Sequence, residues 1–292
     1  MKRKGQVLSC IMETAAIIED CRAGVVGGIM AGIEIWEIAI LPFLLNNCET
    51  WIEISKKSIE TLEDIQYMFL RYLMATPRSC PIPSLLWETG SLMMEHRIAK
   101  KKLLFYYHLL NLPVDSLAYE VADIQAKLSF PGLVQECQTL IEKFELPDIS
   151  KLSKAQWKKS VNQKIREKNR MDILERSKKY KKIEFDIMNA EKFETKSYLV
   201  KLHLADARLR FSIKSKMTKT IQMNFKGDPK YSKNLWKCQD CHTPDTQEHV
   251  VRCPTYQQLR VGKDLGKDKD LVDYFRKVIE NRMKIGNEKQ VI

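Results

Sequence analysis

Apolar residues recur at intervals of three and four along most of the chain, which is typical of helices with one buried face. The clearest example covers residues 55–76, and its apolar positions are Ile59, Leu62, Ile65, Phe69, Tyr72 and Leu73. Pro77 follows it, where a helix commonly ends, and Ser55 or Ser58 is suited to cap its start. Strand patterns are weak throughout, so the sequence predicts an all-α fold.

Residues 24–45 are apolar on most faces of a helix, which predicts a helix buried in the protein. A membrane span is disfavoured, because Glu34 and Glu37 lie mid-segment at a cost of about 2–3 kcal/mol each in a bilayer, and Pro42 interrupts the run. Further helices are predicted at 84–90 (closed by Gly90), 91–112, about 115–128, 132–144, 197–213 and about 268–285 (capped by Asp268).

Residues 151–182 differ in character, with 13 Lys and Arg against 3 acidic residues. They predict a long basic helix with a narrow apolar seam of Trp157, Ile165, Met171, Leu174 and Tyr180. Such a helix suits a phosphate backbone, because each contact between lysine and phosphate releases condensed counterions. The alternative is a solvated helix that packs on its seam. The candidate contacts are Lys158, Lys159, Lys164 and Arg166.

The 292 residues of the chain suffice for one large or two modest domains. Charge is distributed unevenly over them. The net charge is +12. Residues 1–149 hold 14 Lys and Arg against 19 Asp and Glu, which leaves 35 against 18 for residues 150–292. A strongly basic rear half indicates a polyanionic partner, with colloidal solubility as the alternative.

Cys238, Cys241, His249 and Cys253 follow the pattern C-x2-C-x7-H-x3-C, which predicts a closed tetrahedral zinc site. The last two are one helical turn apart, so both can face the metal. His242 adjoins Cys241 and is poorly placed to complete the tetrahedron. The loop between the ligand pairs contains three turn-forming residues, Thr243, Pro244 and Asp245.

The remaining cysteines and histidines show no ligand spacing. The cysteines indicate reduced thiols of an intracellular protein, nuclear or cytoplasmic, and not a disulfide framework; they are Cys10, Cys21, Cys48, Cys80 and Cys137. His96 and His108 have no partner at a ligand spacing, so we interpret each as a histidine at the edge of the core.

The sequence lacks the common motifs of catalytic and phosphate-binding sites. It has no phosphate-cradling Gly-rich loop, no G-x-S-x-G, no H-E-x-x-H and no Asp-Asp pair for two-metal phosphoryl transfer. A zinc ion with four protein ligands keeps no open position for a substrate. The sequence therefore predicts no catalytic residues, no small-molecule substrate and no cofactor other than zinc.

Four stretches resemble the reverse transcriptases of non-LTR retrotransposons. Residues 40–51 resemble the "ILP-x-LLYG-x-E-T-W" segment just past the polymerase palm, although Asn46-Asn47-Cys48 replaces the usual Tyr-Gly-Ala. Residues 74–90 and 97–110 resemble the thumb that follows it, and 238–260 resemble the zinc motif near the C-terminus of those polyproteins. In order and spacing, the resemblance covers about 24–283.

The resemblance implies a thumb that grips a primer–template duplex, and a linker and zinc motif that bind target DNA or element RNA. The Asp-Asp metal site of the polymerase palm would lie before residue 1, and an endonuclease domain would need more room than the residues after Cys253 provide. The chain is therefore expected to be a C-terminal piece without the polymerase active site, so we do not expect it to be an enzyme by itself.

The expected organisation is an N-terminal segment (1–23), a thumb-like helical domain (24–149), a basic helical linker (150–235), a CCHC zinc module (236–260) and a C-terminal helix (261–292). In the first interpretation the protein binds RNA or DNA, with Trp236, Lys237, Arg252 and Arg260 also facing the nucleic acid. Trp236 stacks on an unpaired base or covers the metal site. In the second interpretation it is a structural or protein-interaction protein with a zinc staple. The oligomeric state stays open.

Overall fold

The computed structural model confirms the all-α prediction for the part of the chain that it describes, in which no strand occurs. The described residues are 28–128, 130–180, 183, 185–217, 238, 241–244 and 246–289, without the side chains of 185–187 and 282–289. They form two compact units. The first holds Gly32–Tyr72 and Pro81–Thr195, and the second holds 28–31, Leu73–Cys80 and the chain from Lys196 onward.

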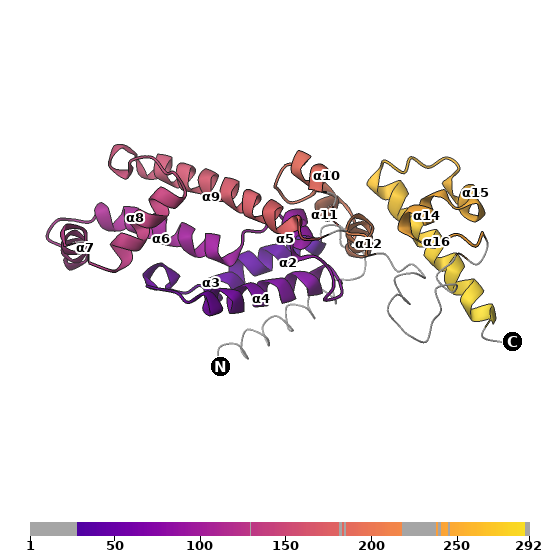
Figure 1. Cartoon of the computed structure of the whole chain (residues 1–292), viewed down its shortest axis with the longest axis horizontal. Coiled ribbons are helices and arrows are strands. Elements are labelled where there is room, and N and C mark those ends of the chain that lie inside the picture. Colours follow the sequence, from indigo (N-terminus) through magenta and orange to yellow (C-terminus); the bar gives the residue numbers. More distant parts are fainter. Residues whose placement is uncertain are drawn as a thin grey trace. The chain divides into compact units, whose positions relative to one another are not determined.

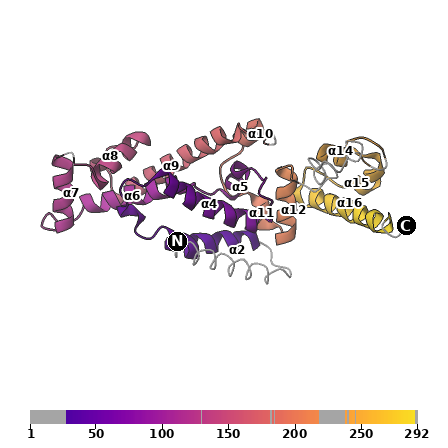
Figure 2. The same ribbon diagram turned by 60° about the horizontal axis from the view of Figure 1, so that its bottom comes forward.

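Five of the predicted helices are present within three residues of their expected bounds, namely those at 55–76, 84–90, 91–112, 115–128 and 132–144. The main helices of the first unit are α4 (Lys56–Leu73), α5 (Ile82–Thr89), α6 (Met94–Leu110), α7 (Leu117–Lys127), α8 (Leu133–Lys143), α9 (Lys154–Ser177) and α10 (Phe185–Ala190). Helix α6 is central and packs against α7, α8 and α9 (Figures 1 and 2). The Ser55 hydroxyl accepts a hydrogen bond from the Ser58 amide at 3.1 Å, which confirms that Ser55 caps α4.

The turn after α5 depends on Gly90. Its φ of +63° lies in the left-handed region, and a Cβ atom there would lie 2.7 Å from the backbone nitrogen of Thr195. Only glycine therefore fits, and it closes α5 as predicted. The Thr195 hydroxyl donates to the Thr89 carbonyl at 3.0 Å, so the same turn connects α5 to the end of the unit.

The prediction that 24–45 is a helix buried on most sides is wrong for its described part. The segment forms α2 (Gly28–Ile35), a π-helical turn (Trp36–Ile40) and α3 (Leu41–Leu44), and it leaves Ile38 77% and Phe43 53% exposed. The wide turn precedes Pro42, which lacks an amide hydrogen and would clash with the carbonyl four residues earlier in a regular helix. Among the described helices, none combines the length and the apolarity needed to cross a bilayer.

Helix α9 is the predicted long basic helix, and its apolar seam differs from the predicted one. The buried seam is Trp157, Val161, Ile165, Asn169, Ile173, Leu174 and Ser177. Met171 is 56% exposed and Tyr180 follows the helix, so both were wrongly assigned to the seam. Asn169 belongs to the seam because its Oδ1 accepts a hydrogen bond from the Met93 amide at 2.9 Å, which hydrophobicity alone does not predict.

The second unit contains the C-terminal helices. Its elements after Lys196 are α11 (Ser197–Lys201), α12 (Leu204–Lys214), α14 (Gln247–Arg252), η5 (Pro254–Tyr256), α15 (Gln257–Arg260) and α16 (Asp268–Lys289). The single helix predicted at 197–213 is wrong, because Leu202 takes an extended backbone (φ −95°, ψ 156°) between α11 and α12. Helix α16 packs against α12, and Asp268 accepts a hydrogen bond from Arg210.

His96 lies inside the core of the first unit, not at its edge, whereas His108 is exposed. The His96 Nε2 atom lies 3.1 Å from the Asp172 carboxylate of α9. Burial lowers the pKa of His96 to about 4, although the neighbouring Glu95 and Asp172 carboxylates act in the opposite direction. Folding therefore favours the neutral imidazole.

A depressed histidine pKa predicts a loss of stability in acid. Between the ordinary pKa of about 6.5 and the folded value the unfolded chain binds more protons, so the stability present above pH ~6.5 should fall on the order of 1–3 kcal/mol towards pH ~4. Denaturant unfolding at several pH values measures this. The His96→Gln variant should show a flatter profile; an unchanged slope would assign the loss to other groups.

Candidate metal centre

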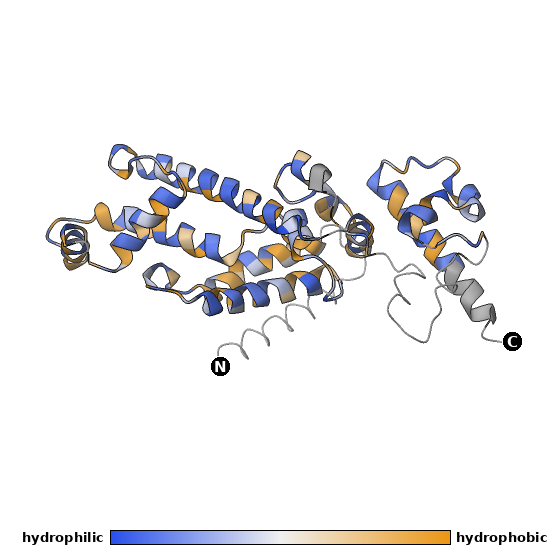
Figure 3. Ribbon diagram, in the orientation of Figure 1, coloured by the Kyte–Doolittle hydropathy of each residue, from blue (hydrophilic) through white to orange (hydrophobic). Residues whose placement is uncertain are grey.

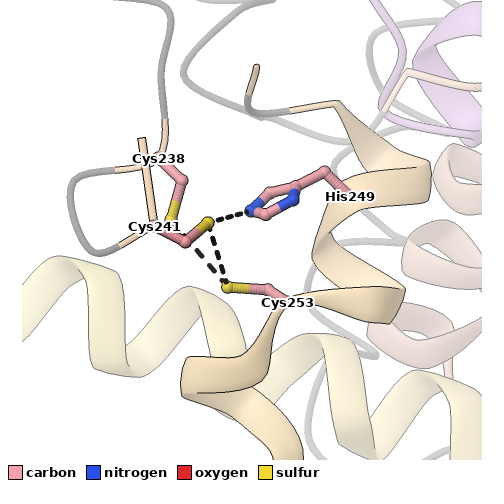
Figure 4. A group of neighbouring side chains, drawn as sticks. All are labelled: Cys238, Cys241, His249 and Cys253. Carbon is pink, nitrogen blue, oxygen red and sulfur yellow. Dashed lines mark hydrogen bonds between the residues drawn. The ribbon is translucent and has the colours of Figure 1, made fainter. Parts of the chain in front are cut away.

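Four side chains converge in the second unit, Cys238, Cys241, His249 and Cys253 (Figure 4). Their ligand atoms all lie within 4.8 Å of one another. They are the four residues that the sequence pattern selected. No other cluster of this kind occurs among the described residues.

The distances between the ligand atoms suit a common metal ion. The Cys253 sulfur lies 3.9 Å from both the Cys238 and Cys241 sulfurs, and the Cys241 sulfur lies 3.3 Å from His249 Nε2. A disulfide bond would be near ~2.05 Å. Around a tetrahedral ion with metal–sulfur bonds of ~2.3 Å and metal–nitrogen bonds of ~2.0 Å, two sulfurs lie ~3.8 Å apart and sulfur and nitrogen ~3.5 Å. The four residues can therefore hold one metal ion.

Local backbone hydrogen bonds build both halves of the site. The Cys238 amide donates to the Thr243 carbonyl at 2.7 Å, and the His242 amide donates to the Cys238 carbonyl at 3.0 Å. This tight turn carries the first two sulfurs, and His242 within it adopts a left-handed φ of +58°. Helix α14 carries His249, and Cys253 follows its end, so the predicted one-turn separation is confirmed.

Thr243 contacts two of the ligands. Its hydroxyl lies 2.9 Å from the Cys241 sulfur and 2.9 Å from His249 Nδ1. A hydroxyl can donate to a thiolate while it accepts from the Nδ1 hydrogen, which leaves Nε2 to face the sulfurs. The same hydroxyl lowers the pKa of the Cys241 thiol and so favours the thiolate that binds metal. The sequence identified Thr243 only as a turn former.

The site is embedded in the core of its unit. Cys238 and Cys253 are buried, and they pack in one cluster with Val250, Tyr256 and Tyr274. The Tyr274 hydroxyl donates to the Val250 carbonyl at 2.6 Å, which links α16 to the helix that carries His249. A metal ion with these four protein ligands would be fully coordinated, which is typical of a structural and not a catalytic site.

The residues predicted to contact nucleic acid near the centre have different surroundings. Trp236 and Lys237 lie outside the described residues. Arg252 is exposed at the end of α14. One guanidinium nitrogen of Arg260 donates to the Val251 and Cys253 carbonyls at 2.9 Å each, so this side chain supports the ligand loop. His242 is exposed and outside the cluster, as predicted.

The four predicted contacts in the first unit lie on α9. Lys158, Lys159 and Arg166 are exposed, whereas Lys164 is 36% exposed and lies 3.5 Å from the Glu145 carboxylate. Helix α9 is blue, hence hydrophilic, over most of its visible length in Figure 3. The helix therefore presents positive charge to solvent while its seam is buried.

Three other cysteines lie in the described part of the chain, and all are buried residues outside any disulfide bond; they are Cys48, Cys80 and Cys137. Burial raises the pKa of Cys48 to about 11 and that of Cys137 to about 12, so both stay protonated and unreactive. This confirms the prediction of reduced thiols for these three, while Cys10 and Cys21 lie outside the described residues.

The fold and the site together define a helical protein with a candidate metal centre of three cysteines and one histidine. Comparison of the chain with models of protein families, with curated proteins and with solved structures found no match.

Replacing one ligand should abolish metal binding. In the Cys241→Ser or His249→Ala variant, the bound metal should fall from about one ion per chain to almost none, because three ligands do not close a structural tetrahedron. Elemental analysis of purified protein measures the ratio. The matched control is His242→Ala, which should keep the metal because His242 lies outside the cluster. Equal loss in the control would refute the ligand assignment.

Removing the Thr243 hydroxyl should weaken metal binding without abolishing it. In Thr243→Val the hydrogen bonds to Cys241 and His249 disappear, and the removal of such supporting hydrogen bonds typically lowers metal affinity ~10–100-fold. Competition with a chromogenic chelator measures the affinity. Thr243→Ser keeps the hydroxyl and should bind nearly as tightly as the wild type; equal weakening in both variants would point to packing of the methyl group.

Proposed function

We propose that the protein binds RNA or DNA through the basic face of α9, and that a zinc ion fixes the C-terminal module. The observation that carries the proposal is the set of unneutralised cations along α9. Lys158, Lys159 and Arg166 are exposed and have no carboxylate within ion-pair distance among the described residues. A row of free cations on a rigid helix is the arrangement that a phosphate backbone recognises.

The other cations of α9 serve as an internal comparison. Lys168 lies 2.9 Å from Asp172, and Arg176 lies 3.3 Å from Glu63. These ion pairs lower the free-energy cost of placing a positively charged side chain near the core. The unpaired cations contribute no such stabilisation, so their presence needs another cause. A polyanionic ligand is the cause that we propose, and colloidal solubility is the alternative.

The donor set supports zinc as the metal. Three thiolates and an imidazole are soft to borderline ligands, which zinc binds in a tetrahedron, whereas magnesium and calcium require oxygen ligands. Zinc in such a closed set contributes to folding and does no chemistry on a substrate. The centre therefore serves to hold α14, α15 and α16 together.

The resemblance to non-LTR reverse transcriptases adds a further part to the proposal. We infer that the chain is a C-terminal piece of such a polymerase, without the catalytic aspartates. Support comes from the order of the matching segments, with 40–51 and 74–90 ahead of the CCHC motif. An upstream reading frame that encodes an Asp-Asp motif would support this origin, and primer extension by the chain alone would contradict the absence of the active site.

A protein-interaction role is the second candidate, and an exposed apolar face favours it. Residues of α7 and its flanks follow a spacing of three and four, and they are 46–77% exposed; they are Val114, Leu117, Val121, Ile124 and Leu128. A face of this kind marks an interaction site more often than a solvated surface. It lies on a different helix from the cations, so separate variants distinguish the two roles.

Nucleic-acid binding should depend steeply on salt and on the α9 cations. The logarithm of the binding constant should fall linearly with that of the salt concentration. In a Lys158→Gln, Lys159→Gln, Arg166→Gln triple variant, the slope should decrease by ~0.9 on duplex DNA, or by ~0.7 on a single strand, for each phosphate that is no longer neutralised. Fluorescence anisotropy with labelled oligonucleotides measures both the affinity and the slope.

The matched control removes the same charges elsewhere, in a Lys56→Gln, Lys57→Gln, Arg78→Gln triple variant of exposed residues. It should keep nearly the wild-type slope, because these positions lie off α9. Wild-type affinity in the α9 variant, or no binding at low salt, contradicts the proposal. Retained nucleic-acid binding together with loss of a protein partner would favour the second candidate.

A further inference from the structure

Two hollows lie along the line where helices α6 and α9 meet, and we call them together the α6–α9 groove. Arg97 and Lys100 of α6 line one hollow with Asn162 and Arg166 of α9, and Tyr107 of α6 lines the other with residues near the start of α9. The start of α6 thus faces the middle of α9, and the end of α6 faces the start of α9, so the two helices run antiparallel in contact (Figures 1 and 2).

The first hollow is a polar cleft of about 510 Å³ with an excess of positive charge. The Arg97 guanidinium donates to both Glu37 oxygens, at 2.6 and 2.9 Å, and to the Leu92 carbonyl at 3.1 Å, so its charge is matched. Lys100 and Arg166 also line the cleft, and neither has a carboxylate within ion-pair distance among the described residues.

The pKa of Lys100 reflects this excess of positive charge. Partial burial, followed by the nearby Arg97 and Arg166 guanidinium groups, lowers the pKa of its ammonium group. An anion in the cleft would relieve this repulsion. Asn162 and Ser91 add neutral polar groups to the same lining. The cleft therefore has the charge and the hydrogen-bonding groups that suit a phosphate.

The second hollow, of about 300 Å³, is mainly apolar. Its lining comprises Leu104, Tyr107, His108, Asn111, Lys154, Trp157 and Lys158. Trp157 is fully buried and its ring stacks with that of Tyr107, with centroids 6.3 Å apart at an angle of 22°. Their polar atoms are already used, since Trp157 Nε1 donates to the Leu103 carbonyl and Tyr107 Oη donates to the Leu152 carbonyl. Because Trp157 is fully buried, the aromatic surface that the hollow offers a ligand is that of the half-buried Tyr107, bordered by Lys154 and Lys158.

One stripe of α9 joins the two hollows. Lys154, Lys158, Asn162 and Arg166 recur at every fourth residue and therefore lie on one side of the helix. From Lys158 to Arg166 the helix rises ~12 Å. This equals three to four nucleotides of a stacked strand at ~3.4 Å each.

We propose that this groove binds one single strand of nucleic acid, with an unpaired base in the aromatic hollow and a backbone phosphate at Lys100 and Arg166. The inference rests on the proposed function and narrows it to single-stranded nucleic acid as the ligand and to this groove as the binding site. Bases in a duplex are paired and stacked, so they cannot enter the hollow without being extruded, whereas every unpaired base has a face that stacks on an aromatic ring.

The test uses the full chain and three labelled probes of equal length, namely an oligothymidylate, the same strand with one internal abasic position, and a duplex. Wild-type protein should bind the intact strand more tightly than the abasic strand or the duplex, about tenfold for one stacked base. Tyr107→Ala should remove the difference between the intact and abasic strands. Tyr107→Phe keeps the ring and should retain that difference, which separates stacking from a folding defect.

The cleft is tested with Lys100→Gln and Arg166→Gln. Each should reduce the salt slope on the single strand by ~0.7, whereas the exposed Lys56→Gln should not. The groove assignment is overturned if the wild type binds the duplex more tightly, or binds the intact and abasic strands equally well. It is also overturned if the cleft variants keep the same salt slope as Lys56→Gln. In each of these cases nucleic-acid binding elsewhere on α9 still stands. If no probe binds at low salt, the proposed function fails as well.

Discussion

The packing of the narrow α9 seam against α6 is the interaction on which the first unit depends. Two hydrogen bonds between buried groups set its register, from Trp157 Nε1 to the Leu103 carbonyl and from the Met93 amide to Asn169 Oδ1. A buried polar group that loses its partner costs about 1–3 kcal/mol, so a shifted helix would be penalised at both ends. Because the seam is narrow, the rest of the α9 surface is available for cations.

The second unit depends on a different constraint. Its helices are short, and α14 has only six residues, which is too few for a stable helix alone. Packing of α16 through Tyr274 and convergence of the four ligand residues compensate for this. Here a metal ion would act as a core, whereas in the first unit side-chain packing fulfils that role.

The two proposals therefore assign different tasks to the two units. In the first unit, side-chain packing positions cations and an aromatic hollow along one groove. In the second unit, metal coordination holds the small C-terminal module together. Arg260 illustrates the second task, since its guanidinium group donates to the Val251 and Cys253 carbonyls beside the ligands. An exposed cation and a cation that satisfies carbonyls look the same in a sequence and differ only in what surrounds them.

The sequence by itself determined the helical class, the position of most helices and the four candidate ligands, because helical periodicity and ligand spacing are local properties of the chain. Only the tertiary structure decided that Asn169 is buried and Met171 exposed, that the chain breaks at Leu202, and that Thr243 supports the metal ligands. It also brought Lys100 beside Arg166, 66 positions along the chain. These features depend on contacts between residues distant in sequence, or on which face of a helix packs against another element. Local periodicity predicts neither of these.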